Sequence, residues 1–337
     1  MAWCSGRVGT NALGVPHAEV HALAMAGEAA RDATLFVTLE PCCHTGKTPP
    51  CTDAIVSAGI RRVVVAATDP FPAVAGKSIS FLKKAGLQVD VGLSQQEATR
   101  LTAPFRMLTM AKRPWVIAKW AMTIDGYLAL PNASTDDSGE SHQYQWISSE
   151  ISRAIVHDLR RRVDAIVVGV QTALADDPLL TARPSGSRPL VRVVLDRQAR
   201  LPVSSRLVQT AHEHPVLVAV GPRAAKDQVK QLQDNGCEIW HSSTDQSSQM
   251  LIDLAHEFGA RQMTNVLVEG GAHVLESCFK ADIIDEVWAF LAPKILDVNA
   301  PSLRLREILS KTRVEAIDQT GGDLFVRGLL RHDLLGR

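Results

Sequence analysis

The sequence lacks an excess of charge of either sign, because 36 lysines and arginines balance 36 aspartates and glutamates. This balance argues against a chain that coats nucleic acid or binds membranes through a polybasic surface. Long hydrophobic runs are also missing. The longest, such as residues 54–60 and 63–67, fall far short of the roughly 18 apolar residues that span a bilayer. Cysteine is sparse, with six in 337 residues, which excludes a disulfide scaffold.

The beginning of the chain has no secretory signal pattern, because residues 1–4 do not combine a basic region with an apolar core. Apolar residues make up 46% of the chain and charged residues 21%, a composition that argues against disorder. We therefore expect a globular protein of the reducing cytoplasm. At about 150 residues per domain, 337 residues predict two domains.

The first third of the chain alternates between strand and helix patterns. Short apolar runs predict strands at residues 34–40, 61–69 and 87–93, and Ala- and Glu-rich segments predict helices at 17–30, 52–58 and 79–84. This βαβαβ order is typical of a layered α/β domain. One connecting helix is predicted over residues 95–110, and Lys112-Arg113-Pro114 ends it. We place the domain boundary there, giving domains of residues 1–110 and 111–337.

The second domain also reads as an α/β fold. Strands are predicted at residues 115–122, 164–169, 191–196, 216–220, 265–269, 286–290, 313–318 and 324–330. Helix patterns lie between most of them, for example over residues 148–162. Residues 132–141 form a polar, turn-rich loop.

Three short pieces of the first domain predict a metal site: Pro16-His17-Ala18-Glu19, Pro41-Cys42 and Pro50-Cys51. One imidazole and two thiolates leave the fourth tetrahedral position of zinc open for water. Zinc lowers the pKa of that water, and the nearby Glu19 could carry its proton. Nucleobase deaminases combine H-x-E with P-C-x-x-C in this way, although here eight residues separate the cysteines.

The expected local structure allows both thiols to converge on the histidine. Cys51 follows Pro50 at a predicted helix start, where the helix dipole favours a thiolate, and Cys42 follows the end of a strand. Two alternatives stay open. Cys43 and His44 are possible ligands, and His44 as a fourth ligand would make the site structural. The cysteines could also be buried core thiols.

In the second domain, Glu269-Gly270-Gly271 ends a predicted strand and opens a helix. Backbone N–H groups there can approach a phosphate, although paired glycines after a strand are more often a simple turn. Arg160 and Arg183 are candidates for phosphate contact, because guanidinium groups pair with phosphate through two hydrogen bonds. Without further information, Arg160 in Arg160-Arg161-Arg162 reads as part of a solvated helix face.

Residues 16–23 and 40–51 resemble the bifunctional riboflavin-biosynthesis deaminase/reductase family, and the spacer of residues 44–50 is the most distinctive part. Residues 113–126, 165–183, 268–272 and 285–294 resemble its reductase half. The resemblance implies a cytidine-deaminase-like three-layer domain, shortened at its N-terminus, followed by a dihydrofolate-reductase-like domain. It also implies phosphoribosyl pyrimidine substrates and a homo-oligomer, with no nucleic-acid or membrane partner.

The resemblance also implies roles for individual residues. His17, Cys42 and Cys51 would bind zinc, Glu19 would be the proton donor, and Lys119 is a candidate for assisting the reduction. Substrate contacts would come from Lys47, Asp69, Arg160, Leu180, Arg183 and Glu269. NADPH contacts would come from Ala121, Trp146, Thr172, Asp176, Gly271, Ala272, His273, Val274, Leu275, Glu276 and Ser277.

Several positions depart from the family pattern. The segment before His17 is shorter than usual, Thr10 stands where a His is common, and Phe71 stands where a polar residue contacts substrate. Tyr144 replaces a usual Ser, a role that Ser141 could fill. A misassigned start or a true truncation would explain the short segment. The alternative function is therefore a monofunctional reductase with a zinc-binding but deaminase-impaired first domain. A non-enzymatic zinc module joined to a nucleotide-sensing domain is a third hypothesis.

Overall fold

The computed structural model describes residues 17–45, 49–71, 74–128, 147–186, 188–295 and 303–330. The chain divides into two compact units, and the division falls after Ala111. Within the described ranges, no helix is both long enough and apolar enough to cross a membrane.

The first unit is built on a three-stranded parallel sheet with the strand order β1–β2–β3. The strands are β1 (Thr34–Leu39), β2 (Arg62–Ala67) and β3 (Gln88–Val91). Helix α1 (Ala18–Ala26) and the 3₁₀ helix η1 (Gly27–Ala30) precede β1, and α2 (Cys51–Ser57) and α3 (Lys77–Lys84) connect the strands. The predicted βαβαβ alternation is confirmed. The central strand β2 is almost wholly apolar, as expected of a parallel strand covered on both faces.

The core of this unit gathers around β2. Val63 and Val65 of that strand pack with Ile55 of α2, Leu82 of α3 and Val37 of β1, all of them buried. The β-branched side chains suit the pleated surface of a sheet. This packing fixes the strand ends and helix starts that carry the chemically interesting residues.

The predicted single helix over residues 95–110 is wrong, because the structure has two helices there, α4 (Gln95–Leu101) and α5 (Ala103–Ala111). Pro104 lies in the first turn of α5. It has no N–H for the carbonyl of Arg100, and its ring would clash with that carbonyl in a continuous helix. Thr102 sits between the two helices, and its hydroxyl donates to the Ala98 carbonyl at 2.9 Å.

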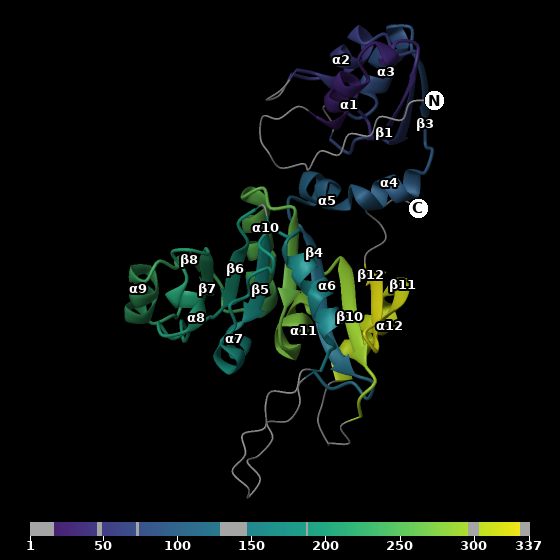
Figure 1. Ribbon diagram of the computed structural model, residues 1–337. Coiled ribbons are helices and arrows are strands. Elements are labelled where there is room, and N and C mark those ends of the chain that lie inside the picture. The colour runs from purple at the N-terminus through teal and green to yellow at the C-terminus, as the bar shows by residue number, and fades with distance from the viewer. Residues whose placement is uncertain are drawn as a thin grey trace, which may run out of the picture. The chain divides into compact units, whose positions relative to one another are not determined.

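The second unit is built on a nine-stranded sheet in the order β11–β12–β10–β4–β9–β5–β6–β7–β8 (Figure 1). All neighbouring strands pair in parallel except β10 with β12 and β11 with β12, which pair antiparallel. The strands are β4 (Trp115–Thr123), β5 (Ala165–Gly169), β6 (Val191–Leu195), β7 (Val216–Val220), β8 (Glu238–His241), β9 (Asn265–Glu269), β10 (Glu286–Ala292), β11 (Arg313–Thr320) and β12 (Asp323–Leu329). The helices are α6 (Glu150–Arg160), α7 (Val170–Asp176), α8 (Arg206–Gln209), α9 (Lys226–Asp234), α10 (Ser247–Ala260), α11 (Ala272–Lys280) and α12 (Leu303–Lys311).

The sequence patterns predicted eight of these strands and missed β8. The missed strand lies at the end of the sheet, and its Glu238 and His241 are exposed. A short edge strand needs no continuous apolar face, so it leaves a weak sequence signal. The interior strands β5 and β7 are buried along their whole length and have a clear sequence signal.

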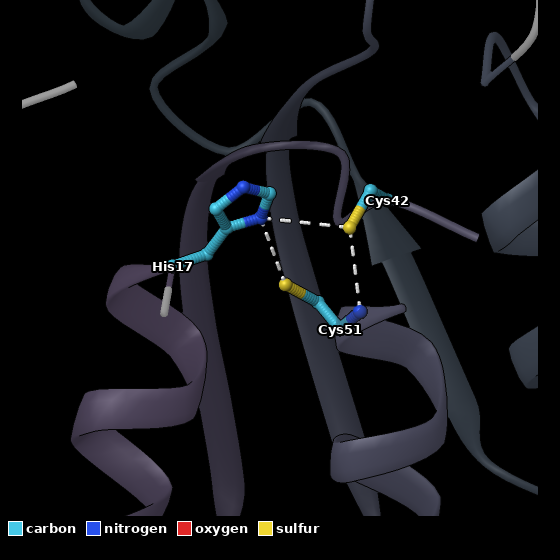
Figure 2. Close-up of side chains that lie close together, drawn as sticks. All are labelled: His17, Cys42 and Cys51. Carbon is cyan, nitrogen blue, oxygen red and sulfur yellow. Dashed lines mark hydrogen bonds between the residues drawn. The ribbon is translucent and has the colours of Figure 1, made fainter. Parts of the chain in front are cut away.

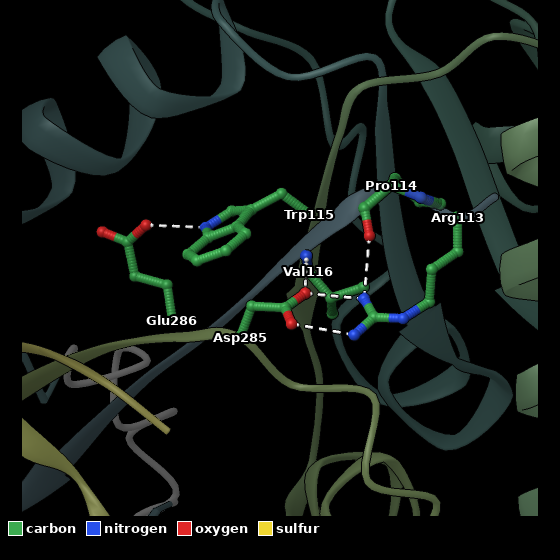
Figure 3. Close-up of polar contacts among 6 residues, drawn as sticks. All are labelled: Arg113, Pro114, Trp115, Val116, Asp285 and Glu286. Carbon is green, nitrogen blue, oxygen red and sulfur yellow. Dashed lines mark hydrogen bonds and ion pairs between the residues drawn. The ribbon is translucent and has the colours of Figure 1, made fainter. Parts of the chain in front are cut away.

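A polar network joins the beginnings of β4 and β10, two strands that are adjacent in the sheet (Figure 3). Arg113 donates to both carboxylate oxygens of Asp285, at 2.7 and 2.8 Å, and the Val116 N–H donates to the same carboxylate. Glu286 accepts the indole N–H of Trp115 at 2.9 Å and that of Trp288 at 2.8 Å. Arg113, Asp285 and Glu286 are buried. The Arg113–Asp285 ion pair and the indole hydrogen bonds to Glu286 offset the cost of their desolvation.

Candidate functional site

Three potential metal ligands converge in the first unit. His17 directly precedes α1, Cys51 is the first residue of α2, and Cys42 lies in the loop after β1. Figure 2 shows the imidazole ring and the two thiols facing one another, and their ligand atoms all lie within 4.8 Å. The structure thus brings together the three ligands proposed from the sequence.

The contacts within this group are close. His17 Nδ1 lies 3.2 Å from Cys51 Sγ and 3.5 Å from Cys42 Sγ, and the Cys51 backbone N–H donates to Cys42 Sγ at 3.3 Å. One imidazole and two thiols form a donor set that zinc prefers, and three protein ligands leave a fourth position for water. The donor chemistry therefore fits a catalytic zinc ion.

The two cysteines differ in acidity. A hydrogen bond from Cys51 is the main cause that lowers the pKa of Cys42 to about 5, against the opposing effect of burial. The same contact is the main cause that raises the pKa of Cys51, and burial and the Glu19 charge raise it further. In the metal-free pair Cys42 is the thiolate and Cys51 keeps the proton. Metal binding must displace that proton, so binding releases protons.

Glu19 lies beside the cluster without belonging to it. It is in the first turn of α1, and its Oε2 is 3.7 Å from Cys51 Sγ. A carboxylate at this place is suited to exchange a proton with a group bound at the open position. This is the arrangement expected of a non-ligating acid/base residue.

The alternative ligands Cys43 and His44 do not join the group that the described residues form. The ring of His44 instead contacts that of Phe71, with centroids 6.0 Å apart and planes tilted by 54°. Phe71, one of the departures from the family pattern, therefore packs beside the metal-binding loop. Lys47, Thr10, Tyr144 and Ser141 lie outside the described residues.

Asp69 lies in the loop after β2 and is almost fully buried. Its Oδ1 accepts the Phe71 N–H at 2.7 Å. Burial raises the pKa of Asp69, and the charge of Glu40 adds to this, while Arg106 and His44 act in the opposite direction. Arg106, which sequence reasoning missed, also donates to the Thr68 carbonyl at 3.1 Å. It lies on α5, and nothing in the sequence linked that helix to this loop.

A second cluster lies in the second unit, around Glu269 at the end of β9. Arg160 of α6 donates to both oxygens of Glu269, at 2.8 and 2.9 Å, and Lys119 Nζ lies 3.9 Å from Glu269 Oε2. Burial lowers the pKa of Lys119, and the Glu269 charge only partly offsets it. Burial alone would raise the pKa of Glu269, but the Arg160 and Lys119 cations outweigh it and lower that pKa.

The interpretation of Arg160 as part of a solvated helix face is wrong. Its side chain is 14% exposed and faces Glu269, whereas the side chain of Arg162, just beyond the end of α6, is 58% exposed and pairs with Asp158 of that helix. The turn of the helix separates neighbouring arginines onto different faces.

His157 is a further residue of this cluster that sequence reasoning missed. It lies one turn before Arg160 on α6, and its Nδ1 is buried with no hydrogen-bond partner among the described residues. Burial lowers its pKa, and the charges of Arg160 and Arg183 lower it further. His157 and Arg160 are three positions apart and therefore share one face of α6, which was the sequence signal that could have identified His157.

The start of α11 forms the other part of this site. The Gly271 N–H donates to Thr172 Oγ1 of α7 at 3.3 Å. A Cβ built on Gly271 would meet only that oxygen, at 3.6 Å, so there is space beside the backbone. Gly169, by contrast, must lack a side chain, because a Cβ there would lie 2.7 Å from Val274. A helix N-terminus with open backbone suits a phosphate of a nucleotide.

The remaining cofactor and substrate candidates fall at different places. Ala121 lies two residues after Lys119 on β4, hence on the same face of the sheet, and Asp176 ends α7. Leu275 belongs to the buried core, and Glu276 pairs with Lys280, so their side chains are engaged within the unit. Leu180 is buried with φ of +54°, a left-handed conformation that is costly for leucine. Trp146 lies outside the described residues.

Two protein families match the chain. Residues 114–326 match the RibD C-terminal domain, and residues 5–67 match the cytidine and deoxycytidylate deaminase zinc-binding region. The riboflavin biosynthesis protein RibD of Aquifex aeolicus is 38% identical over 319 residues, covering 93% of the chain and 85% of that protein. RibD of Escherichia coli is 34% identical over 308 residues, covering 86% and 78% respectively.

Solved structures show the same similarity. Acinetobacter baumannii RibD, form 1, matches with a TM-score of 0.76 and 31% identity, covering 95% of the chain and 86% of that structure. A diaminohydroxyphosphoribosylaminopyrimidine deaminase/5-amino-6-(5-phosphoribosylamino)uracil reductase of Thermotoga maritima matches with a TM-score of 0.74 and 31% identity, covering 93% and 85%. These matches confirm an α/β fold with a deaminase domain followed by a reductase domain of the RibD C-terminal type.

Proposed function

The chain belongs to the RibD family of riboflavin-biosynthesis proteins, and from this membership we propose that it performs two consecutive reactions on phosphoribosyl pyrimidines. It is a bifunctional enzyme that joins a deaminase to a reductase. We assign the deaminase to residues 1–110 and the reductase to residues 111–337. The family resemblance further supports a cytoplasmic homo-oligomer.

The first reaction is the hydrolytic deamination of 2,5-diamino-6-ribosylamino-4(3H)-pyrimidinone 5′-phosphate, the substrate class that the name of the Thermotoga protein describes. His17, Cys42 and Cys51 would hold zinc, which when bound supplies a water of lowered pKa. Glu19 takes a proton from the attacking water and passes it to the amino group. The C–N bond then breaks, a carbonyl forms and ammonia leaves. Lys47 and Asp69 would hold the substrate.

The second reaction reduces 5-amino-6-(5-phosphoribosylamino)uracil to its ribityl product. NADPH, when bound, supplies the hydride. Lys119, held near Glu269, would supply the proton that balances hydride addition. Arg160, Glu269, Leu180 and Arg183 would orient the substrate. The proposed NADPH contacts are Ala121, Trp146, Thr172, Asp176 and the segment Gly271, Ala272, His273, Val274, Leu275, Glu276 and Ser277.

One observation carries the proposal for the deaminase. Three zinc-type ligands lie within 4.8 Å of one another, and a separate carboxylate, that of Glu19, lies 3.7 Å from Cys51 Sγ. A structural zinc site would normally use four protein ligands and needs no such carboxylate.

Glu19→Gln tests the two-site mechanism. A glutamine cannot exchange the proton, so ammonia release should be abolished while NADPH oxidation on the deaminated substrate is kept. Glu28→Gln, an exposed change in the neighbouring helix η1, is the matched control and should keep both activities. Equal loss of both activities in Glu19→Gln would contradict the two-site mechanism. Stoichiometric zinc without ammonia release from the unaltered chain would favour the monofunctional reductase.

A further inference from the structure

Glu40 is a buried carboxylate outside the residues predicted to bind metal, substrate or cofactor. It follows the last residue of β1, two positions before the proposed ligand Cys42, and is only 3% exposed. Its backbone N–H donates to the Ala67 carbonyl at 2.9 Å, which extends the β1–β2 pairing up to the metal-binding loop. A carboxylate in such a place needs strong partners to offset its desolvation.

Main-chain N–H groups from a distant segment supply all the partners that the structure gives this carboxylate. Oε2 accepts from Asp69 at 3.3 Å and from Gly76 at 2.9 Å. Oε1 accepts from Ser78 at 3.2 Å and from Ile79 at 3.4 Å. Hydrogen bonds to an ionised acceptor are stronger than those between neutral groups.

Two of these donors lie in the first turn of α3, which has no cap of its own. Gly76 occupies the cap position in a left-handed conformation, with φ of +73°, and has no side chain to accept the free N–H groups. Glu40 therefore takes the place of an N-cap, from a residue 36 positions earlier in the chain. A negative charge at that end of the helix is favourable.

The same carboxylate holds the loop that carries Asp69. That side chain is almost fully buried, and its electrostatic environment includes His44 of the metal-binding loop and Arg106. Glu40 is thus connected to Cys42 through two peptide units of the backbone and to Asp69 through a hydrogen bond. Any shift of its carboxylate moves the metal-binding loop and the Asp69 loop relative to each other.

We propose that Glu40 is a positioning residue of the deaminase, which sets the distance between the pyrimidine-binding loop of Asp69 and the metal-binding loop of Cys42. This inference rests on the proposed function. It assigns to Glu40 neither a ligand nor a proton-transfer role. Its effect is on how well substrate binds next to the reacting centre, because misplacement of a binding loop weakens the productive geometry.

The test compares Glu40→Gln with the unaltered chain, both zinc-loaded and held well below their melting temperatures. A glutamine presents an NH₂ group to backbone donors, so part of the contact is lost. We expect the KM for ammonia release to rise about tenfold, the order of effect for buried donors left without partners. Zinc stoichiometry and the KM for NADPH oxidation on the deaminated substrate should not change.

Hydrogen–deuterium exchange provides a readout that does not depend on activity. The amides of Asp69, Gly76, Ser78 and Ile79 should exchange faster in Glu40→Gln, whereas those of β2 should not. Glu40→Asp keeps the charge on a shorter side chain and should give an intermediate KM and intermediate exchange. Asp164→Asn is the matched control. It alters a carboxylate that accepts the Thr264 and Asn265 N–H groups in the second unit, and it should leave the KM for ammonia release unchanged.

Two results would overturn the proposal: an unchanged KM in a folded Glu40→Gln protein whose amides have lost protection, or a loss of activity that only follows a loss of zinc. If Glu40→Gln does not fold, the same criteria apply to Glu40→Asp. Failure of the proposed function is a different result, namely an unaltered, zinc-loaded chain that releases no ammonia.

Discussion

Lys119 and Glu269 lie opposite each other at one register position of the adjacent parallel strands β4 and β9, with Nζ 3.9 Å from Oε2. Both carboxylate oxygens of Glu269 accept short hydrogen bonds from Arg160, so the contact with Lys119 is the longer and weaker one. Lys119 is therefore only partly compensated, and Phe290, whose ring centroid is 5.8 Å from Nζ, provides a further weak contact. A buried ammonium group whose charge is only partly compensated loses its proton more readily than an exposed one.

The first prediction concerns the pH dependence of the reductase. Burial lowers the pKa of Lys119, so the lysine should lose its proton, and the reductase its activity, at a pH below the ordinary value of about 10.4. Lys119→Met should reduce kcat about 100-fold, within the usual range for a lost general acid. The measurement is the pH profile of NADPH oxidation on the deaminated substrate.

Lys119→Arg is the control for charge in this experiment. Arginine keeps the positive charge but does not titrate in the accessible range, so the alkaline loss of activity should disappear even where the rate is low. An identical alkaline limb in Lys119→Arg would assign the titration to another group.

The second prediction concerns metal removal. A chelator, or the substitution Cys42→Ser, should remove zinc and abolish ammonia release, because two ligands do not retain the ion in a reactive geometry. NADPH oxidation on the deaminated substrate should persist, and metal content is measured beside both activities. Cys43→Ser is the matched control, since the adjacent thiol lies outside the ligand group and should keep zinc. Loss of zinc in Cys43→Ser would show that the ligand set is different.

The third prediction concerns stability. Asp285→Asn leaves the Arg113 guanidinium buried without its counter-charge, and should destabilise the second unit by about 3–5 kcal/mol. Asp158→Asn breaks exposed ion pairs with Arg161 and Arg162 and should cost less than about 1 kcal/mol. Denaturant unfolding of both variants measures the difference. Similar midpoints would mean that the buried pair contributes no more than a surface one.

The strands other than β8, and the metal ligands, were predictable because their signals are local. The apolar run of β2 identifies a buried strand by itself. His17, Cys42 and Cys51 each follow a proline, at two helix starts and after a strand end that the local sequence indicates. The break between α4 and α5 was also encoded locally, in Pro104. The expectation of one helix gave that proline too little weight.

Other features depend on contacts that no local pattern contains. Arg160 could not be separated from Arg161 and Arg162 until the phase of α6 was fixed against β9. Glu40 reads as the polar end of a strand, yet its partners lie 29 to 39 residues later. The perturbed environment of His157 comes from burial and from the charges of Arg160 and Arg183, which only the fold brings together.

The carboxylate of Glu286, which binds the indoles of Trp115 and Trp288, has a consequence for spectroscopy. Residues 17–111 contain no tryptophan, and five of the six in the chain follow residue 111. Tryptophan fluorescence therefore comes mainly from the reductase part. Glu286 and Trp288 lie on the same strand, so when β4 separates from β10 the indole of Trp115 should lose this acceptor while that of Trp288 can keep it. Tryptophan emission is therefore an optical probe of unfolding of the second unit, and residues 17–111 contribute no signal to it.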